Sequence, residues 1–284
     1  ELTPIDGAGK AGYLKDVDSG EIWSPAFCPA GERNRSVQTA YLPGRAVFKS
    51  LNHKIAAELT VGVLHDKPCE VWILKLQNRS ARHRSLSFTT YFRLSAGSGL
   101  ELKFMPEEKA LVGRKALGSL QAGVTEPGRD LVFFHASTLI PSSYEIERAD
   151  FLGDGGTLRS PRALQQERSG GHDGTAENAI MSLTVCVDLP IEGEAEIGFC
   201  FGASESVEGA LDAVRSLNEI DAAMEALERS GQHWPSISST LAVKTPDAAL
   251  DALVNTWLPY ETYAGWTTRR TGGVIMDGSQ IVDS

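Results

Sequence analysis

Up to about residue 202, the chain is a series of short stretches rich in β-branched and aromatic residues, separated by clusters of Gly, Pro, Asn and Ser. This pattern predicts strands joined by turns. Within residues 86–94, apolar residues mostly alternate with polar ones, as expected for a strand with one face on a core. The clearest stretches are 55–64, 69–77, 86–94, 131–137, 181–188 and 195–201. Most segments between them are too short for crossover helices, so the sequence predicts a mainly β fold, a sandwich of antiparallel sheets.

Two connecting segments differ from the others. Residues 78–84 are polar and lie between two predicted strands, which indicates a hairpin connection. Residues 142–178 contain Asp154-Gly155-Gly156 and Ser169-Gly170-Gly171, and few apolar residues follow Leu164. We expect a long surface loop there, and loops of this length in compact domains often carry function.

The hydrophobic period changes after Gly202, where apolar residues recur at steps of three and four. This spacing places them on one face of a helix, or of two consecutive helices, ending near Gly231. The residues are Val207, Leu211, Val214, Leu217, Ile220, Met224 and Leu227. Residues 202–206 resemble a Gly-x-Ser-x-Gly nucleophile elbow without its second Gly, so we expect a serine there to cap the helix.

A second helix is predicted where Thr245 can act as the cap, Pro246 occupies the first turn and Asp247 adds favourable charge. Its apolar stripe is Leu250, Leu253, Val254, Trp257 and Leu258, and Pro259 is expected to kink or end it. One such helix cannot bury its stripe alone, so it must lie on the β domain, dimerise or await a helical domain. We therefore divide the chain into a β domain (1–202), a helical linker (203–244) and the start of a truncated helical domain (245–284).

The charge balance excludes whole classes of partner. The 284 residues include 27 Lys and Arg against 37 Asp and Glu, for a net charge of −10. This excludes a generally basic nucleic-acid binder and disfavours docking on an anionic membrane. The longest apolar runs are strand-sized, so we also expect no direct membrane insertion.

Local motifs for metals and cofactors are missing. Cys28, Cys69, Cys186 and Cys200 are far apart, which predicts reduced, mostly buried thiols rather than a zinc ribbon or a disulfide framework. The six histidines never stand at i, i+2 or i, i+4 to one another, and no Gly-Lys-Ser/Thr phosphate loop occurs. The sequence thus predicts neither a metal site nor a bound cofactor.

Aromatic residues near the end of the chain suggest carbohydrate chemistry, because the apolar faces of sugars stack on Trp and Tyr. Trp257, Tyr260, Tyr263 and Trp266 stand three residues apart, close to Arg269. Spacing alone favours packing against neighbouring helices over sugar binding. Two carboxylate pairs, Asp277 with Asp283 and Asp150 with Asp154, are candidates for glycoside chemistry, although each Asp is also a common solvated turn residue.

Several segments resemble one known family. They are Asp-Val-Asp-Ser-Gly-Glu-Ile-Trp-Ser-Pro (16–25), Glu-Leu-Thr-Val (58–61), Leu-Lys-Leu-Gln-Asn-Arg-Ser (74–80) with Arg-Ser-Leu-Ser (84–87), Glu-Arg-Ala-Asp-Phe-Leu-Gly (147–153), Gly-Thr-Leu (156–158), Pro-Arg-Ala-Leu (161–164) and Leu-Val-Asn-Thr-Trp-Leu-Pro-Tyr-Glu (253–261). Together they cover nearly the whole chain and resemble the amino-terminal part of glycoside hydrolase family 94. The family includes the cellobiose and chitobiose phosphorylases, and the resemblance is greatest to the phosphorylase-like region of cyclic β-1,2-glucan synthases.

The resemblance implies a β-supersandwich of the galactose-mutarotase-like type, then linker helices, then the first helix of an incomplete (α/α)6 barrel. It also implies a parent enzyme that uses inorganic phosphate as co-substrate, with inversion at the sugar, and a general-acid Asp in a Gly-Phe-Arg-Asp-Gln-x-x-Asp segment. Here Ser279 aligns with the acid position and Asp283 with the second Asp, while a one-residue insertion places Asp277 near the acid position. A serine hydroxyl cannot serve as the acid. We therefore expect no catalysis from this chain alone.

Three hypotheses follow. The first is the carbohydrate-binding and scaffold portion of a larger enzyme, with Arg148, Trp266 and Arg269 contacting a β-gluco-oligosaccharide and a helical catalytic domain as partner. For Arg148, the alternative is a surface ion pair with Glu145, Glu147 or Asp150.

The second hypothesis is a stand-alone sugar-binding or assembly module, for which a second copy of the chain is the candidate partner. The third is a small enzyme that uses Asp277 and Asp283, whose six-residue separation would place them on different faces of a helix. The resemblance further implies a soluble domain of a bacterial parent that is cytoplasmic or associated with the cytoplasmic membrane.

Overall fold

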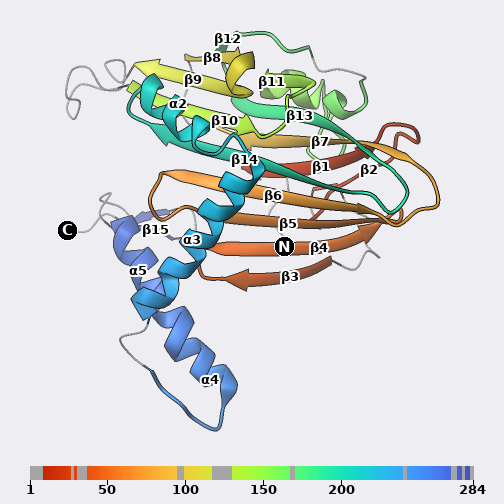
Figure 1. The fold of residues 1–284 in the computed structure, drawn as a ribbon. Coiled ribbons are helices and arrows are strands. Elements are labelled where there is room, and N and C mark those ends of the chain that lie inside the picture. The colour runs from red at the N-terminus through yellow and green to blue at the C-terminus, as the bar shows by residue number, and fades with distance from the viewer. Residues whose placement is uncertain are drawn as a thin grey trace.

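Two antiparallel sheets make up most of the computed structural model, which describes residues 9–26, 29–30, 37–94, 99–116, 130–166, 170–238, 242–269, 274–276 and 279–281. In the described chain the small sheet has the order β11 (Ser143–Glu147), β13 (Ala179–Leu189), β7 (Arg84–Arg93), β1 (Lys10–Asp16) and β2 (Ile22–Trp23). The large sheet has the order β12 (Gly174–Ala176), β8 (Leu100–Met105), β9 (Ala110–Ala116), β10 (Asp130–Ser137), β14 (Glu194–Ser204), β6 (Cys69–Asn78), β5 (Ile55–Val63), β4 (Arg45–Asn52) and β3 (Val37–Leu42). The six stretches with the clearest strand pattern are strands, so the prediction of an antiparallel sandwich is confirmed (Figure 1).

The main core lies between the two sheets and follows from the side-chain alternation of the strands. In β6, Trp72, Leu74 and Leu76 point to the core between the sheets, while Val71 and Ile73 belong to a second cluster on the outer face. Both faces of β6 are covered at residues 71–74, so this part of its sequence is a continuous apolar run rather than an alternating one.

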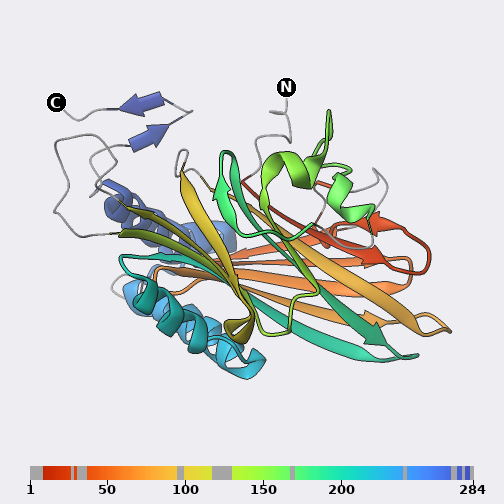
Figure 2. The same ribbon diagram turned by 90° about the horizontal axis from the view of Figure 1, so that it is seen from above.

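Helices α2 (Val207–Arg215) and α3 (Ile220–Ser238) cover part of the outer face of the large sheet (Figure 2). The predicted apolar face is confirmed, since Val214, Leu217 and Leu227 are buried against the sheet. Ser206 caps α2 by accepting a hydrogen bond from Gly209 N at 3.1 Å. The prediction that the helical stretch ends near Gly231 is wrong: α3 continues to Ser238.

The outer face of the small sheet is covered by residues 148–166, on the opposite side of the sandwich from α2 and α3 (Figure 2). This segment contains α1 (Arg148–Leu152) and the 3-10 turn η4 (Arg162–Leu164). The prediction of a surface loop over 142–178 is therefore wrong where that range forms β11, α1, η4 and β12 (Gly174–Ala176) and where its apolar side chains pack on the small sheet. Four side chains explain the difference, because they are buried on the small sheet although their spacing follows no helical or strand period: Phe151, Leu152, Leu158 and Leu164.

The connection between β6 and β7 is not a hairpin, because these strands belong to different sheets. β6 pairs with β5 and β14, whereas β7 pairs with β1 and β13. The buried side-chain amide of Asn78 stabilises the segment that passes from one sheet to the other. Its Nδ2 donates to the carbonyls of Arg82, Leu189 and Pro190, and its Oδ1 accepts from Ser80. The polar residues at this connection thus bind one another and the neighbouring turn.

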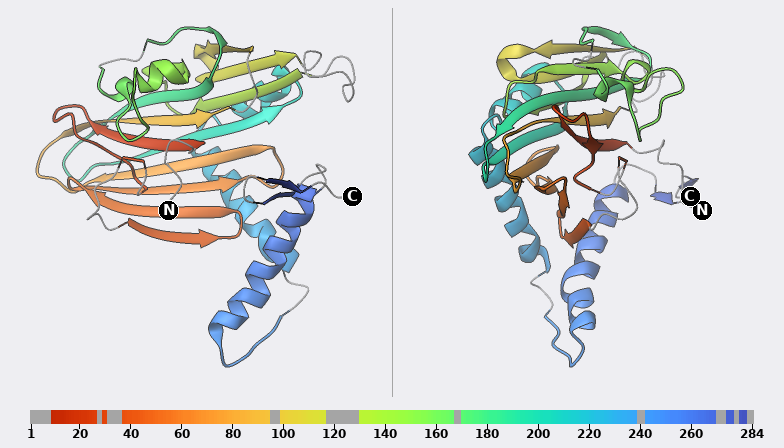
Figure 3. Two further views of the ribbon diagram at one scale, coloured as in Figure 1. Left: turned by 180° about the vertical axis from the view of Figure 1, so that it is seen from behind. Right: turned by 90° about the vertical axis from the view of Figure 1, so that its right-hand side faces the viewer.

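The chain continues into α4 (Ala248–Ala252), the π-helical segment η5 (Leu253–Trp257) and α5 (Leu258–Arg269), which extend away from the sheets (Figure 3). Asp247 caps α4 through Ala249 N and Leu250 N, so the prediction that Thr245 is the cap is wrong. Of the two effects predicted for Pro259, a kink or an end of the helix, the end does not occur, because α5 continues to Arg269. In η5 the N–H of Leu258 donates to the carbonyl of Leu253, which is five residues back instead of four. The hydrogen-bond pattern of the helix is therefore already changed at the residue before Pro259, which has no N–H to donate.

Three short elements complete the description: the 3-10 turn η2 (Pro106–Glu108), β15 (Val274–Met276) and β16 (Ser279–Ile281). Strand β14 ends at Ser204 and α2 begins at Val207, while the proposed division at residues 202 and 244 stays a prediction. Among the described residues, no helix is both long enough and apolar enough to cross a membrane.

Candidate functional site

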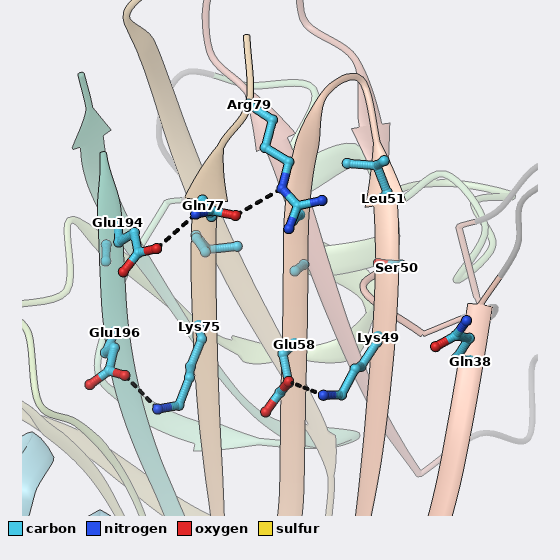
Figure 4. Close-up of a pocket in the computed structure, with 14 residues that line it drawn as sticks. Gln38, Lys49, Ser50, Leu51, Glu58, Lys75, Gln77, Arg79, Glu194 and Glu196 are labelled. Carbon is cyan, nitrogen blue, oxygen red and sulfur yellow. Dashed lines mark hydrogen bonds and ion pairs between the residues drawn. The ribbon is translucent and has the colours of Figure 1, made fainter. Parts of the chain in front are cut away.

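A polar hollow lies on the outer face of the large sheet, where α3 does not cover it (Figure 4). It encloses about 510 Å³ and is formed by the ends of β3, β4, β5, β6 and β14. Its lining residues are Gln38, Lys49, Ser50, Leu51, Ala56, Ala57, Glu58, Lys75, Leu76, Gln77, Arg79, Glu194, Ala195 and Glu196. We refer to it as the sheet hollow.

Charges of alternating sign run across the sheet hollow in strand register. Lys49 stands opposite Glu58, which stands opposite Lys75, which in turn stands opposite Glu196. Two of these opposite pairs form ion pairs: Lys49 with Glu58 at 2.7 Å and Lys75 with Glu196 at 2.6 Å (Figure 4). These half-exposed groups offer donors and acceptors to sugar hydroxyls, but none of the lining residues is aromatic, so the hollow has no stacking platform.

A smaller pocket of about 280 Å³ lies beside α1, and we call it the α1 pocket. It is lined by Glu145, Asp150, Arg162, Ala163, Gln166, Gly170 and His172. Glu145 is only 3% exposed, and its Oε1 accepts hydrogen bonds from Ile146 N at 3.0 Å and Glu147 N at 3.4 Å. Burial raises the pKa of the Glu145 carboxyl above its ordinary value. The pocket thus contains a carboxyl group that is costly to keep charged.

Arg148 does not line the α1 pocket. It is half-buried, its Nε is enclosed, and its guanidinium faces the buried hydroxyl of Tyr91. Burial raises the pKa of Tyr91, and the charge of Arg148 opposes that rise. Among the ion pairs of the described residues, none joins Arg148 to Glu145, Glu147 or Asp150, so the surface-pair alternative does not describe this side chain.

The aromatic residues near the end of the chain pack on α3. Trp234 contacts Tyr260 and Tyr263, with ring centroids 4.8 and 5.8 Å apart, and Trp257 contacts Tyr260 at 6.0 Å. These edge-to-face contacts are helix packing, as the spacing favoured. The side chain of Trp266, which belongs to α5 like Arg269, is outside the described part of the structure.

The candidate catalytic residues belong to the end of the chain. Asp277 and Asp283 lie outside the described residues, and Ser279 is described only as the first residue of β16. Cys28 is also outside them, whereas Cys69 and Cys200 are buried free thiols and Cys186 is exposed. The prediction of reduced, mostly buried thiols is thus confirmed for Cys69 and Cys200, whereas Cys186 is reduced but exposed.

Residues in the family-like motifs have structural partners in the fold. Asp16 is fully buried, forms an ion pair with Arg84, and accepts hydrogen bonds from Asp18 N and Ser19 N at 2.9 and 3.0 Å. Burial would raise the pKa of Asp16, but the Ser19 hydrogen bond and Arg84 outweigh it, so the pKa is lowered. The motifs at 16–25 and 84–87 thus meet in a turn and a buried ion pair.

Comparison with known proteins agrees with the fold. The family model described as glycosyl hydrolase 94, supersandwich domain, matches residues 1–220. The 3-O-β-D-glucopyranosyl-β-D-glucuronide phosphorylase of Paenibacillus borealis is 25% identical over 96% of this chain and 36% of its own length. The cellobionic acid phosphorylase of Neurospora crassa is 27% identical over 90% of this chain and 33% of its own. The cyclic β-(1,2)-glucan synthase NdvB of Rhizobium meliloti is 24% identical over 92% of this chain and 9% of its own.

Solved structures show the same fold at low identity. A family 92 glycosyl hydrolase, ccman5, aligns with 97% of this chain and 35% of its own at a TM-score of 0.52 and 14% identity. A bacterial glucoamylase in complex with acarbose aligns with 84% of this chain and 33% of its own at a TM-score of 0.50 and 11% identity. The chain spans about a third of the length of the two phosphorylases that it matches. The match over residues 1–220 shows that the chain belongs to the glycosyl hydrolase 94 supersandwich-domain family.

Proposed function

We propose that this chain is the carbohydrate-binding and scaffold portion of a family 94 glycoside phosphorylase or cyclic β-1,2-glucan synthase, and that it is inactive alone. The observation that carries the proposal is the family match over residues 1–220, combined with phosphorylase relatives of which the chain spans about a third. A parent of this kind would use inorganic phosphate as co-substrate. Its acid position would fall near Asp277 or Ser279.

The scaffold role is supported by an apolar stripe that the β sandwich leaves open. Leu250, Leu253 and Leu258 on α4, η5 and α5 are 43 to 47% exposed. Figure 3 shows these helices projecting beyond the sheets. An amphipathic helix gains most of its stability by packing this face, so the stripe suits the remaining helices of a helical catalytic domain.

The sugar-binding role is supported by the sheet hollow. Its polar groups stand on neighbouring strands about 4.8 Å apart, so groups from more than one strand can contact the same sugar ring. Gln77 Nε2 donates to Glu194 Oε1 at 2.8 Å and Gln77 Oε1 accepts from Arg79 Nε at 2.8 Å, which leaves further donors and acceptors at the rim. Arg148, Trp266 and Arg269 remain the proposed contacts outside the hollow.

Calorimetric titration of the purified chain with β-1,2-gluco-oligosaccharides and cello-oligosaccharides, beside an assay of sugar phosphate release, tests the proposal. We expect weak, saturable binding without turnover. Lys75→Ala and Gln77→Ala should weaken binding, while Arg229→Ala, which removes an exposed ion pair on α3, serves as the matched control.

Turnover by this chain would contradict the expectation that it is inactive alone. Equal binding by Lys75→Ala, Gln77→Ala and the Arg229→Ala control would show that the sheet hollow is not the sugar-binding site. Absence of any binding, together with a stable homodimer in solution, would favour the assembly module instead.

A further inference from the structure

Three separate segments bring metal-ligating atoms together in the α1 pocket. Glu145 belongs to β11, Asp150 to α1 and His172 to the loop before β12, and one ligand atom from each lies within 4.8 Å of the other two. Three atoms this close surround a point about 2.8 Å or less from each of them, which exceeds a metal–ligand bond by less than 1 Å. Small rotations of the two exposed side chains would close that gap.

The buried member of the cluster has an unused oxygen. Both hydrogen bonds to Glu145 go to Oε1, and among the described residues no donor reaches Oε2. Keeping the charge on a carboxylate that is 3% exposed is costly, and a cation bound beside it would offset that cost. The backbone donors hold Oε1 in place, so the second oxygen is oriented before any ion arrives.

The loop that carries His172 is also fixed from outside the cluster. Asp173 Oδ1 accepts hydrogen bonds from Phe104 N at 2.8 Å and from Tyr144 Oη at 3.0 Å. Gly171 has a φ of 32°, and a side chain there would contact the Tyr144 ring at 3.2 Å. The imidazole therefore projects from a loop that is tied to β8 and β11, and it needs little ordering to bind.

We propose that Glu145, Asp150 and His172 form a binding site for one divalent transition-metal ion of the zinc class. Two carboxylates and one imidazole suit Zn²⁺ better than Ca²⁺ or Mg²⁺, which prefer oxygen ligands alone. With three protein ligands, the fourth position is left for water. The ion would tie β11, α1 and the loop before β12 together, and so stabilise the cover of the small sheet.

Arg162 is the competing cation. Its Nη2 lies 3.7 Å from Asp150 Oδ1 and donates to the Asp150 carbonyl at 3.3 Å. Because this guanidinium shares Asp150 with the ion and repels it, Arg162→Gln should bind the metal more tightly than the unchanged chain.

The test is calorimetric titration of the tag-free, metal-free chain with Zn²⁺, together with its melting temperature at each metal concentration. We expect one ion per chain and a melting temperature that rises with Zn²⁺. His172→Ala and Glu145→Gln should each lower the affinity at least about tenfold. His83→Ala, which removes an exposed histidine far along the chain from the cluster, is the matched control and should bind as the unchanged chain does.

His172 is exposed, so His172→Ala should fold even if the buried Glu145→Gln does not. A Co²⁺ titration adds a spectroscopic measurement, because the visible absorption of bound Co²⁺ should be lost in His172→Ala and kept in His83→Ala. Absence of stoichiometric binding, or equal binding by His172→Ala and His83→Ala, would overturn the proposal. Neither result depends on oligosaccharide binding, so the metal site and the proposed function can fail separately.

Discussion

The two outer faces of the sandwich are covered in different ways. The large sheet is covered by α2 and α3, two regular helices whose apolar residues repeat at helical spacing. The small sheet is covered by residues 148–166, which contain only five residues of α-helix and one 3-10 turn. Both covers bury apolar side chains completely, so regular secondary structure is not what makes a segment part of the core.

The largest effect is expected from truncating the irregular cover. Phe151 is fully buried and contacts the rings of Tyr13 and Tyr91 at 6.1 and 5.0 Å. Phe151→Ala should lower the free energy of unfolding by about 4 kcal/mol, through lost burial and the cavity left behind. Leu227→Ala on the regular cover should cost about 3 kcal/mol. Urea denaturation of both variants measures this, and a loss below about 1 kcal/mol for Phe151→Ala would show that residues 148–166 are a loosely attached loop.

Removing one partner of the buried ion pair of the small sheet should lower the free energy of unfolding by about 3 kcal/mol, because the other charge stays buried and uncompensated. Asp16→Asn removes the charge that faces Arg84. Since the pKa of Asp16 is lowered in the fold, its stabilising effect is present above the ordinary Asp pKa of about 4 and is lost as the pH falls below it.

Asp16→Asn should therefore flatten the decrease in stability below pH 4 that the unchanged chain shows. Urea denaturation at several pH values measures both effects. An unchanged pH profile in Asp16→Asn would contradict the assignment.

The helix caps of the two covers provide an intermediate effect. Glu147 accepts from Ala149 N at the start of α1, and its Oε2 also accepts from Glu177 N at 2.9 Å and Asn178 N at 3.2 Å. Among the residues that the structure describes, Gly209 N is the one donor to the Ser206 hydroxyl at the start of α2. Glu147→Ala should cost about 2 kcal/mol and Ser206→Ala about 1 kcal/mol, and thermal denaturation ranks them. The reverse ranking would show that the additional contacts of Glu147 contribute nothing.

The smallest effect is expected in the sheet hollow. Lys75 and Glu196 are 42% and 39% exposed, so water screens their ion pair. Lys75→Ala should change the free energy of unfolding by less than about 1 kcal/mol, measured by the same denaturation. A larger loss would mean that these charges are part of the fold rather than free to contact a ligand.

The sequence predicts the strands and the regular cover well, because alternation and helical period are local signals. The crossing at Asn78 could not be predicted, since polar turns that join paired strands and turns that join different sheets have the same composition. The burial of Phe151 and Leu158 could not be predicted either, because Gly153, Gly155 and Gly156 between them indicate a turn, and only the small sheet explains their burial.

The candidate site was less accessible to prediction than the fold. Arg148 stands in a family-like motif but does not line the α1 pocket, and its proposed contact with a sugar stays a prediction. The cluster of Glu145, Asp150 and His172 joins residues up to 27 positions apart (172 − 145 = 27), so no short motif contains them. Glu145 and Glu147 stand on either side of Ile146 in β11, and this alternation alone indicates an acidic strand face and not a metal site.

The central claim is that residues 148–166 are a built cover of the small sheet, and that the α1 pocket is therefore part of the rigid domain. Hydrogen exchange followed by mass spectrometry tests it directly, with peptides from α1 and η4 compared with peptides from α2. The hydrogen bonds of Gly153 N to Ala149 O at 2.8 Å and Gln165 N to Arg162 O at 2.9 Å predict protection similar to that of α2. Exchange of these peptides within seconds, while α2 stays protected, would contradict the claim.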